Sequence, residues 1–443
     1  MQHLLDPNLI KIYKTDKQWL EQTEVPIVTV AGTMREDIKG WHGMIENETI
    51  TDVVLSRAHF SMALAIATKA WGNQIDHHKA WLVDPTNYVS QEQWQSITLT
   101  ESVGKALARN PMLKLLKDAI DRFGRQQLPI LDSITPPLLY LTENITKPIL
   151  SLHVAAGNIL LEHGKTVLQV ITDPHVRYDY LTQIDNPKLT FCVFDQLTKD
   201  DLLEKVALLG KSIDPHRVIV TGPPIDPRVF ASRTKKHPWR SGKLNLCITT
   251  GGLGTNKPEI VGLLEQLLPI IRNSDCNINL LIYCGTHKDL RTICLDLARQ
   301  NAVTTENIEN TNASFRCIYH PQIVDANEQL ITYAFPWADG FISKPSGDMA
   351  YDAVASGSFL LTLQEWGEWE SVIRERFESQ GIARRVIPNQ FLAQLNELTS
   401  AKGQATSWIE RAMLAARKIP PSAINGTEAI LQAYFQLGKQ RKS

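Results

Sequence analysis

Short runs of apolar residues alternate along this chain with longer amphipathic stretches. The apolar runs predict buried strands at Val25–Val30, Asp52–Leu55, Ala80–Val83, Pro148–Leu152, Val167–Ile171, Leu189–Phe194, Val218–Val220, Leu244–Thr250, Ile278–Cys284, Phe315–Tyr319, Gly340–Ser343 and Phe359–Leu363. The amphipathic stretches predict helices, including His59–Lys69, Leu202–Leu209, Glu259–Ile271, Leu290–Gln300 and two that end near Glu162 and Ser356. Strands that alternate with helices indicate parallel sheets with helices on both faces, so the predicted fold class is α/β.

A proline-rich stretch, Thr221–Lys243, interrupts this alternation and predicts a linker between two domains. It contains four prolines and a basic cluster at Arg233–Lys236, and the strand–helix pattern restarts after it. We therefore expect two doubly wound domains that face a cleft with the carboxyl ends of their strands, where ligands bind. The expected boundaries are an N-terminal extension at 1–49, a first domain at 50–228, the linker at 229–243, a second domain at 244–423, and a C-terminal helix and tail at 424–443.

Composition supports a globular protein of two domains. The chain has 443 residues, of which 43% are hydrophobic and 21% charged, and its formal net charge is −1. This balance provides no general attraction to nucleic acid, which we do not expect as a partner. Six cysteines without a CxxC pair indicate reduced thiols, and no apolar stretch reaches the roughly 18–20 residues of a membrane span. We expect a cytoplasmic protein, with any membrane contact peripheral, on the inner face of the cell membrane.

Two strand–turn–helix junctions in the second half carry the strongest chemical signal. In the first, the turn Gly251-Gly252-Leu253-Gly254-Thr255-Asn256 follows a predicted strand, and Pro258 opens a helix. In the second, Lys344-Pro345-Ser346-Gly347 follows a strand, and Asp348 and Asp352 begin the helix. Such junctions direct backbone N–H groups and the positive end of a helix dipole at a bound anion. Together they predict a site for a nucleotide diphosphate.

Each junction also has a plainer interpretation. Asp352 lies one helical turn after Asp348, so a carboxylate there can accept hydrogen bonds from the hydroxyls of a ribose. Acidic residues in a first turn also complement the helix dipole without any ligand. The glycine-rich turn Gly251–Asn256 is likewise compatible with an ordinary tight connection between strand and helix.

The first half offers candidates for proton transfer. His59 lies at a predicted helix start, where the dipole disfavours imidazolium, so this ring should stay neutral and able to accept a proton. Asp173 follows an apolar strand and could orient a histidine or bind acceptor hydroxyls. A helix-start histidine without a role and an aspartate that only caps a turn remain alternatives.

A predicted amphipathic helix at Pro111–Phe123 presents an apolar stripe opposite charged residues. The segment Lys105–Arg125 contains six basic and two acidic residues, which suits a membrane surface. Packing against the chain's own sheet is the interpretation we favour. The chain has no HExxH, DxD, GxSxG or GxxxxGK[ST] pattern, and we expect neither a metal nor another cofactor.

The segment KPSGDMAYDAVASG resembles the donor-site motif of the two-domain (GT-B) glycosyltransferases. These include monogalactosyldiacylglycerol synthases and the N-acetylglucosaminyltransferase of peptidoglycan lipid II synthesis. The matching residues are Lys344, Pro345, Gly347, Asp352, Ala353, Ala355 and Gly357, while Ser346 replaces a glycine and Asp352 a glutamate. GGLGTN resembles the family's glycine loop, and AHFSMALAIA its acceptor-side helix start, without the preceding glycines. VITDPH and VIVTGPPIDPRVF resemble a strand-end Thr-Asp and a Gly-x-Pro segment.

The resemblance implies a GT-B fold and an inverting, metal-independent hexosyltransferase that uses a nucleotide sugar, most simply a UDP-sugar. It implies a lipid or glycan acceptor, His59 as base with Asp173 orienting it, and Asp352 on the ribose. Lys344, Ser346, Gly347 and the Gly251–Asn256 loop would hold the diphosphate, the backbone near Tyr319 and His320 would read the base, and Glu370 is retained.

The sequence departs from the family at one further place. Gln-x-x-x-Asn often precedes a glycine by eight residues there, whereas Trp369 and Ile373 stand ahead of Gly381 here. Two alternatives therefore stay open: a nucleotide-sugar-binding subunit without activity, and a UDP-sugar 2-epimerase of the same fold.

Overall fold

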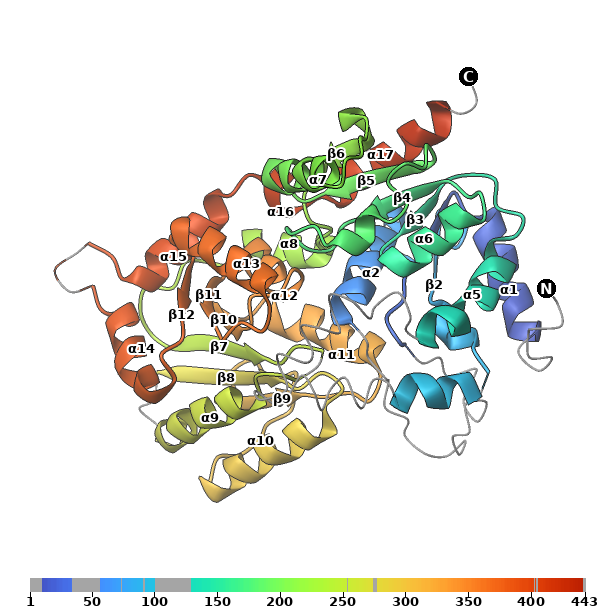
Figure 1. Cartoon of the computed structure of the whole chain (residues 1–443). Coiled ribbons are helices and arrows are strands. Elements are labelled where there is room, and N and C mark those ends of the chain that lie inside the picture. Colours follow the sequence, from blue (N-terminus) through green and yellow to red (C-terminus); the bar gives the residue numbers. More distant parts are fainter. Residues whose placement is uncertain are drawn as a thin grey trace. The chain divides into compact units, whose positions relative to one another are not determined.

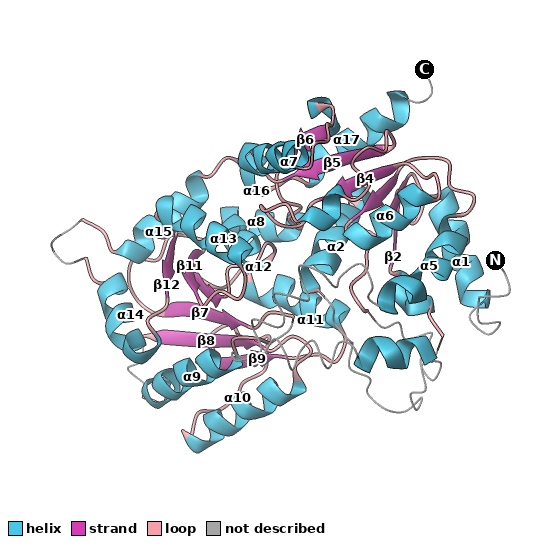
Figure 2. Cartoon of the chain, viewed as in Figure 1, coloured by secondary structure: helices cyan, strands magenta, loops and turns pink. Residues whose placement is uncertain are grey.

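The computed structural model describes residues 10–33, 56–72, 74–90, 92–99, 129–252, 254–273, 277–401, 403 and 405–440. These residues form two compact units, both of the α/β class (Figures 1 and 2). Unit 1 comprises the described residues of Met1–Pro227 and Asn425–Ser443, and unit 2 comprises those of Arg228–Ile424. The predicted fold class is confirmed.

Unit 1 is built on a parallel sheet whose strands, among the described residues, run in the order β2-β1-β3-β4-β5-β6. The strands are β1 (Val25–Val28), β2 (Ala80–Val83), β3 (Ile149–Ser151), β4 (Val167–Val170), β5 (Leu189–Val193) and β6 (Val218–Val220). Most of their side chains are buried, as expected of a parallel sheet that is covered on both faces. The chain turns back between β1 and β3, which makes that pair the switch point of the sheet.

The helices of unit 1 connect and cover these strands. They are α1 (Ile10–Gln22), α2 (Arg57–Trp71), α5 (Pro129–Thr142), α6 (Val154–Glu162), α7 (Gln196–Leu208) and α17 (Thr427–Gln440), with short 3-10 turns at Pro85–Tyr88, Tyr178–Leu181 and Pro215–Arg217. Their apolar faces join the strands in one core that includes Tyr13, Leu138, Leu160 and Phe191.

Segments near both ends of the chain, which were expected outside the first domain, belong to unit 1. The expected N-terminal extension contains β1, which pairs with β2 and β3 in the sheet. All four side chains of β1 are buried, as in a central strand. The expected C-terminal tail contains α17, whose Tyr434 hydroxyl lies 3.0 Å from the Glu24 carbonyl oxygen and 2.9 Å from that of Pro148. The expected separation of residues 1–49 from the first domain therefore differs from the structure, whereas the boundary expected before residue 424 lies within one residue of that between Ile424 and Asn425.

The expected linker is partly helical and belongs to unit 2. Helix α8 (Pro227–Lys235) begins at Pro227, which suits a first helical position because its missing N–H needs no partner there. Basic residues in its last turn, Arg233 and Lys235, complement the helix dipole. Composition indicated a break between domains, but it did not reveal this helix.

Unit 2 contains a parallel sheet in the order β12-β11-β10-β7-β8-β9, again among the described residues. The strands are β7 (Leu244–Thr249), β8 (Ile278–Tyr283), β9 (Phe315–Ile318), β10 (Gly340–Ser343), β11 (Phe359–Thr362) and β12 (Ala383–Arg385). Read from β9, the order is that of a dinucleotide-binding sheet, with the switch point between β7 and β10. In the register of this pair, Gly340 lies opposite Leu246 and Ile342 opposite Ile248.

The helices of unit 2 are α8, α9 (Lys257–Ile271), α10 (Lys288–Gln300), α11 (Ile323–Gln329), α12 (Met349–Ala355), α13 (Glu368–Ser379), α14 (Phe391–Thr399), α15 (Trp408–Lys418) and α16 (Pro421–Ile424). Residues Leu330–Ala334 form a π-helical turn. Apolar side chains of α9, α14 and α15 pack with the strands in a second core.

The predicted strands from Ala80–Val83 to Phe359–Leu363 are all present, with ends that differ by at most one residue. β12, α1 and the helices from α13 to α16 were not predicted, whereas α17 corresponds to the expected C-terminal helix. The predicted strand Asp52–Leu55 and the amphipathic helix Pro111–Phe123 lie outside the described residues.

Candidate functional site

The glycine-rich turn of unit 2 follows β7 at the switch point of the sheet. The Gly254 N–H donates to the Gly251 carbonyl oxygen at 2.9 Å, which closes a four-residue turn. Gly254 has φ +62°, a conformation that suits glycine. After the turn, Asn256 stands at the start of α9. The turn therefore ends at the amino terminus of a 15-residue helix.

The second turn follows β10, the neighbouring strand. The Ser346 N–H donates to the Lys344 carbonyl oxygen at 2.8 Å, and the Ser346 hydroxyl donates to Asp348 Oδ1 at 2.6 Å. The same hydroxyl oxygen accepts from the Met349 N–H at 3.3 Å, so Ser346 caps the start of α12. Asp348 and Asp352 are both 7% exposed, and the Asp352 N–H donates to the Asp348 carbonyl oxygen. The serine that replaces a family glycine thus has a structural role.

Lys344 joins the two turns. A Cβ placed on Gly251 would lie 2.6 Å from Lys344 Cε, so the lysine stem occupies the space that the glycine leaves open. Lys344 Nζ forms an ion pair of 2.6 Å with Glu370 Oε1, and Glu370 is completely buried. The other carboxylate oxygen of Glu370 accepts from the Trp366 N–H at 2.6 Å. A positive charge is therefore fixed beside the glycine-rich turn.

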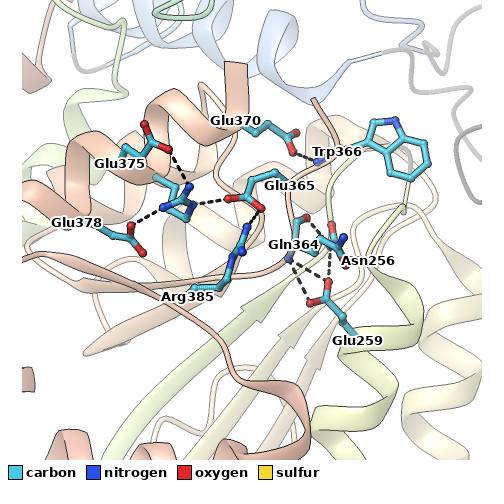
Figure 3. Close-up of polar contacts among 10 residues, drawn as sticks. Asn256, Glu259, Gln364, Glu365, Trp366, Glu370, Glu375, Glu378 and Arg385 are labelled. Atoms are coloured by element: carbon cyan, nitrogen blue, oxygen red, sulfur yellow. Dashed lines mark hydrogen bonds and ion pairs between the residues drawn. The ribbon is translucent and has the colours of Figure 1, made fainter. Parts of the chain in front are cut away.

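The segment between β11 and α13 is held against the start of α9 (Figure 3). Asn256 Nδ2 donates to Glu259 Oε2 at 2.6 Å and to the Gln364 carbonyl oxygen at 3.0 Å. The Gln364 N–H in turn donates to the carboxylate of Glu259 at 3.2 Å. Asn256 thus reaches across to a neighbouring loop and makes no side-chain cap of its own helix.

The far side of the same segment is anchored by ion pairs. Glu365 contacts both Arg374 and Arg385, and Arg374 also contacts Glu375 and Glu378 (Figure 3). Burial raises the pKa of Glu365, but its bonds to the two arginines outweigh burial and leave this pKa lowered. The loop therefore carries a charged carboxylate between two guanidinium groups.

The two positions at which the resembled family often has amides hold side chains that pack within unit 2. Ile373, where the resemblance would place an amide, is completely buried in α13. Trp369 packs over Gly367, since a Cβ there would lie 2.4 Å from the indole ring. Gln364 instead stands at the carboxyl end of β11, beside Asn256. Sequence reasoning missed it, although a Gln-Glu pair directly after a buried strand was the available signal.

Tyr319 and His320 follow β9 at the same edge of the sheet. The Arg291 guanidinium lies 5.2 Å from the centre of the Tyr319 ring. The His320 N–H donates to the Gly285 carbonyl oxygen at 3.1 Å, and His320 Nδ1 accepts from the Gln322 N–H at 3.2 Å. The predicted base-reading segment is thus tied to the turn that follows β8.

In unit 1, His59 lies at the carboxyl edge of the sheet, as predicted. Ser56 caps α2 and accepts from the His59 N–H at 3.4 Å, while Thr29, just after β1, donates to the His59 carbonyl oxygen at 3.1 Å. The His59 ring packs edge-on against His153, with ring centres 4.8 Å apart. His153 begins α6 after β3, so the two histidines lie on either side of the switch point. Sequence reasoning did not select His153.

Asp173, the other predicted acceptor-side residue, follows β4. Burial lowers the pKa of the nearby Arg177, but Tyr180, Asp179 and Asp173 outweigh burial and leave that pKa raised. Asp173 therefore contributes negative charge near the half-buried side chain of Arg177. The ring contact of His59 that the structure defines is the one with His153, and the orienting role predicted for Asp173 stays a prediction.

The end of β1 is held by one buried carboxylate. Asp84 Oδ2 accepts from the Ala31 N–H, the Thr33 N–H and the Thr33 hydroxyl, and Oδ1 accepts from the Thr86 N–H and hydroxyl. Burial raises the pKa of Asp84, and these bonds oppose the shift. Asp84 thereby fixes residues 31–33, directly after β1.

Unit 2 also has a cavity of about 610 Å³ at the amino ends of β7 and β8, lined by Trp239, Leu244, Asn277, Leu395 and neighbouring residues. It lies at the opposite edge of the sheet from the two turns, so it is distinct from the candidate site. Among the described residues, no helix has the length and apolar character needed to cross a membrane.

No protein-family model and no curated protein matches this chain. In structure it is similar to MurG of Acinetobacter baumannii (12% identity, 93% of this chain, 99% of that chain, TM-score 0.47). It is also similar to the glycotransferase of kitacinnamycin (13% identity, 93% of this chain, 98% of that chain, TM-score 0.49). A UDP-N-acetylglucosamine 2-epimerase is likewise similar (12% identity, 94% of this chain, 97% of that chain, TM-score 0.49). At such identities and TM-scores these likenesses do not select a reaction.

The two sheets themselves define the fold. Each unit is Rossmann-like, with a six-stranded parallel sheet among its described residues and helices between successive strands. Each unit therefore has the Rossmann-like architecture of the two domains in a GT-B fold.

Proposed function

We propose that unit 2 binds a nucleotide sugar, most simply a UDP-sugar, and that the protein transfers the sugar to a hydroxyl acceptor. The observation that carries this proposal is the placement of Lys344. Its stem fills the space beside Gly251, and its ammonium group is fixed between two turns at the switch point of the sheet. A diphosphate needs such a combination of lysine charge and backbone N–H groups.

The leaving diphosphate is where electrostatic stabilisation matters most. As the bond from the anomeric carbon to the phosphate oxygen breaks, the electron pair moves onto the diphosphate. Lys344 and the start of α9 would stabilise this charge before and during the reaction, because both are already held in place. With that charge supplied by the protein, we propose that the reaction needs no metal ion.

The rest of the nucleotide would occupy the same edge of the sheet. Asp352 is largely buried near the start of α12 and would accept hydrogen bonds from the ribose hydroxyls. The backbone near Tyr319 and His320 would read the base. Gln364, in the segment between β11 and α13, and Glu370, in the first turn of α13, lie where the sugar would be contacted.

Unit 1 would supply the acceptor side. The acceptor hydroxyl oxygen forms a bond to the anomeric carbon with inversion, and its proton passes to His59. The position of His59 in the first turn of α2 favours the neutral ring that this step requires. A lipid or a glycan hydroxyl is the proposed acceptor. The helix proposed for peripheral membrane contact, Pro111–Phe123, is outside the described residues.

Nucleotide binding tests the donor assignment. We expect UDP to bind more tightly than ADP, GDP or CDP in calorimetric titrations, and Asp352→Asn to weaken UDP binding at least about tenfold, as the loss of hydrogen bonds to a charged group requires. Glu309→Gln is a matched control, because Glu309 is exposed in the loop before β9, at the opposite edge. Equal binding of all four nucleotides would remove the UDP assignment.

Turnover tests the reaction. We expect UDP release from a UDP-hexose to require an added lipid or glycan acceptor and to disappear in His59→Ala. Formation of an epimer or of free sugar would identify a different enzyme. Nucleotide binding without any turnover across the acceptor panel would identify a binding subunit.

A further inference from the structure

A histidine that the proposed mechanism does not use lies directly behind the glycine-rich turn. His287 precedes α10, and its Nε2 lies 3.1 Å from the Gly251 carbonyl oxygen. We propose that His287 is a positioning residue that holds the Gly251–Gly254 turn in the conformation that receives the diphosphate. This inference rests on the proposed function, because it assigns the diphosphate to that turn.

The Gly251 carbonyl oxygen accepts from three groups. The Gly254 N–H at 2.9 Å closes the turn, His287 Nε2 lies at 3.1 Å, and the Thr250 hydroxyl makes a longer contact of 3.4 Å. A carbonyl oxygen has two lone pairs, so the two shorter bonds help to fix the orientation of the peptide group. In a trans peptide the C=O and the following N–H point in opposite directions. The bond from His287 therefore makes the Gly252 N–H point away from His287.

The chemistry of the bond also defines the state of the ring. A carbonyl oxygen only accepts, so Nε2 of His287 must carry a hydrogen. A glutamine side chain can place an amide N–H in a similar position, whereas leucine cannot donate. His287 is 8% exposed, which keeps water from replacing the ring readily. Glutamine at position 287 should therefore preserve the hydrogen bond to Gly251, whereas leucine, which is of similar size, should remove it.

The backbone of His287 is also held in place by hydrogen bonds. Its N–H donates to the Cys284 carbonyl oxygen at 3.0 Å in the turn that follows β8. In the same turn, the Gly285 carbonyl oxygen accepts from the His320 N–H at 3.1 Å. One turn is therefore bonded on one side to the proposed diphosphate site and on the other to the proposed base-reading segment.

The test compares His287→Leu, His287→Gln and the wild-type chain, with His237→Leu as control because His237 is an exposed histidine of the same unit. Hydrogen exchange of the 251–256 amides is measured without ligand, and the Kd for UDP is measured by calorimetry. We expect His287→Leu to speed exchange of these amides and to raise the Kd roughly three- to tenfold, the range for one lost hydrogen bond. His287→Gln should keep both values within about twofold of wild type.

The outcomes separate this inference from the proposed function. Unchanged exchange in His287→Leu, or equal exchange in the leucine and glutamine variants, would overturn the positioning role. Faster exchange in His287→Leu with rescue by glutamine supports it even without nucleotide. If the wild-type protein binds no UDP, the donor proposal fails while the exchange data still decide the role of His287 in the turn.

Discussion

The ion pair between Lys344 and Glu370 leads to the most quantitative prediction. Removing the lysine charge by Lys344→Met leaves the Glu370 carboxylate completely buried, with the Trp366 N–H as its remaining defined hydrogen-bond donor. At the observed 2.6 Å, the attraction between two unit charges is about 6 kcal/mol for an effective dielectric constant near 20. Desolvation of both groups offsets part of this. Breaking a buried pair by removing one partner costs about 3–5 kcal/mol.

We place the expected loss near the lower limit, at about 3 kcal/mol, because the Lys344 side chain is 15% exposed and water can reach it. The described residues of unit 2 span Arg228–Ile424, and in a domain of that size each kcal/mol lowers the Tm by about 2–4 °C. Differential scanning calorimetry should therefore show the transition of unit 2 about 6–12 °C lower in Lys344→Met.

A second variant tests whether the unpaired, buried charge of Glu370 causes the loss of stability. In Lys344→Met/Glu370→Gln the buried charge is absent, and the glutamine oxygen can still accept from the Trp366 N–H, so most of the lost Tm should return. Lys243→Met is the control, since Lys243 is exposed before β7, and its effect should stay within about 0.5 kcal/mol. If Lys344→Met behaves like the control, or if the double variant is no more stable than the single one, the reasoning is refuted.

Three further predictions concern other parts of the chain. Gly251→Ala should raise the Kd for UDP about tenfold in calorimetry with a Tm change below about 3 °C, because the new Cβ displaces only the flexible Lys344 stem; an unchanged Kd would contradict this packing. Burial lowers the pKa of Lys236 to about 7, although Asp339 opposes the shift. The unfolded chain therefore binds more protons than the native one between about pH 7 and 10, so the Tm of unit 2 should rise over that interval. Lys236→Met should lack this rise, and equal slopes of Tm against pH in the two proteins would rule the prediction out. Asp84→Ala leaves the buried N–H groups of Ala31, Thr33 and Thr86 without their acceptor, and should cost about 3 kcal/mol in the transition of unit 1; a wild-type Tm would show that the carboxylate is dispensable.

Much of the proposed donor-side arrangement could be predicted because it is local in sequence. The turns at Gly251–Asn256 and Lys344–Gly347 each follow a strand made of consecutive apolar residues, and each begins a helix. Their closeness follows from one further rule, since β7 and β10 meet at the switch point of a sheet of this order. The pairing of Lys344 with Glu370 was not predicted, because it joins residues 26 positions apart through a loop of irregular conformation.

The contacts on the proposed acceptor side could not be predicted in this way. The sequence places His59 at the start of a helix, but the strand that precedes this helix in the described sheet is β1, and residues 34–55 lie between them. The contact with His153 depends on β1 and β3 being neighbours, which periodicity does not reveal. His287 was missed for a similar reason, because a single histidine after a strand has no spacing that distinguishes it.

The sequence by itself determined the α/β class, most of the strands, the two turns after β7 and β10 and the helices that follow them. These features depend on side-chain periodicity and on glycine and proline at turns, which act over a few residues. Only the tertiary structure decided that β1 and α17 complete unit 1 and that α8 occupies the expected linker. It also decided that Lys344 and His287 contact the turn at Gly251, and that Glu370 pairs with Lys344. These contacts join residues far apart in the chain, and strand order and loop packing bring them together.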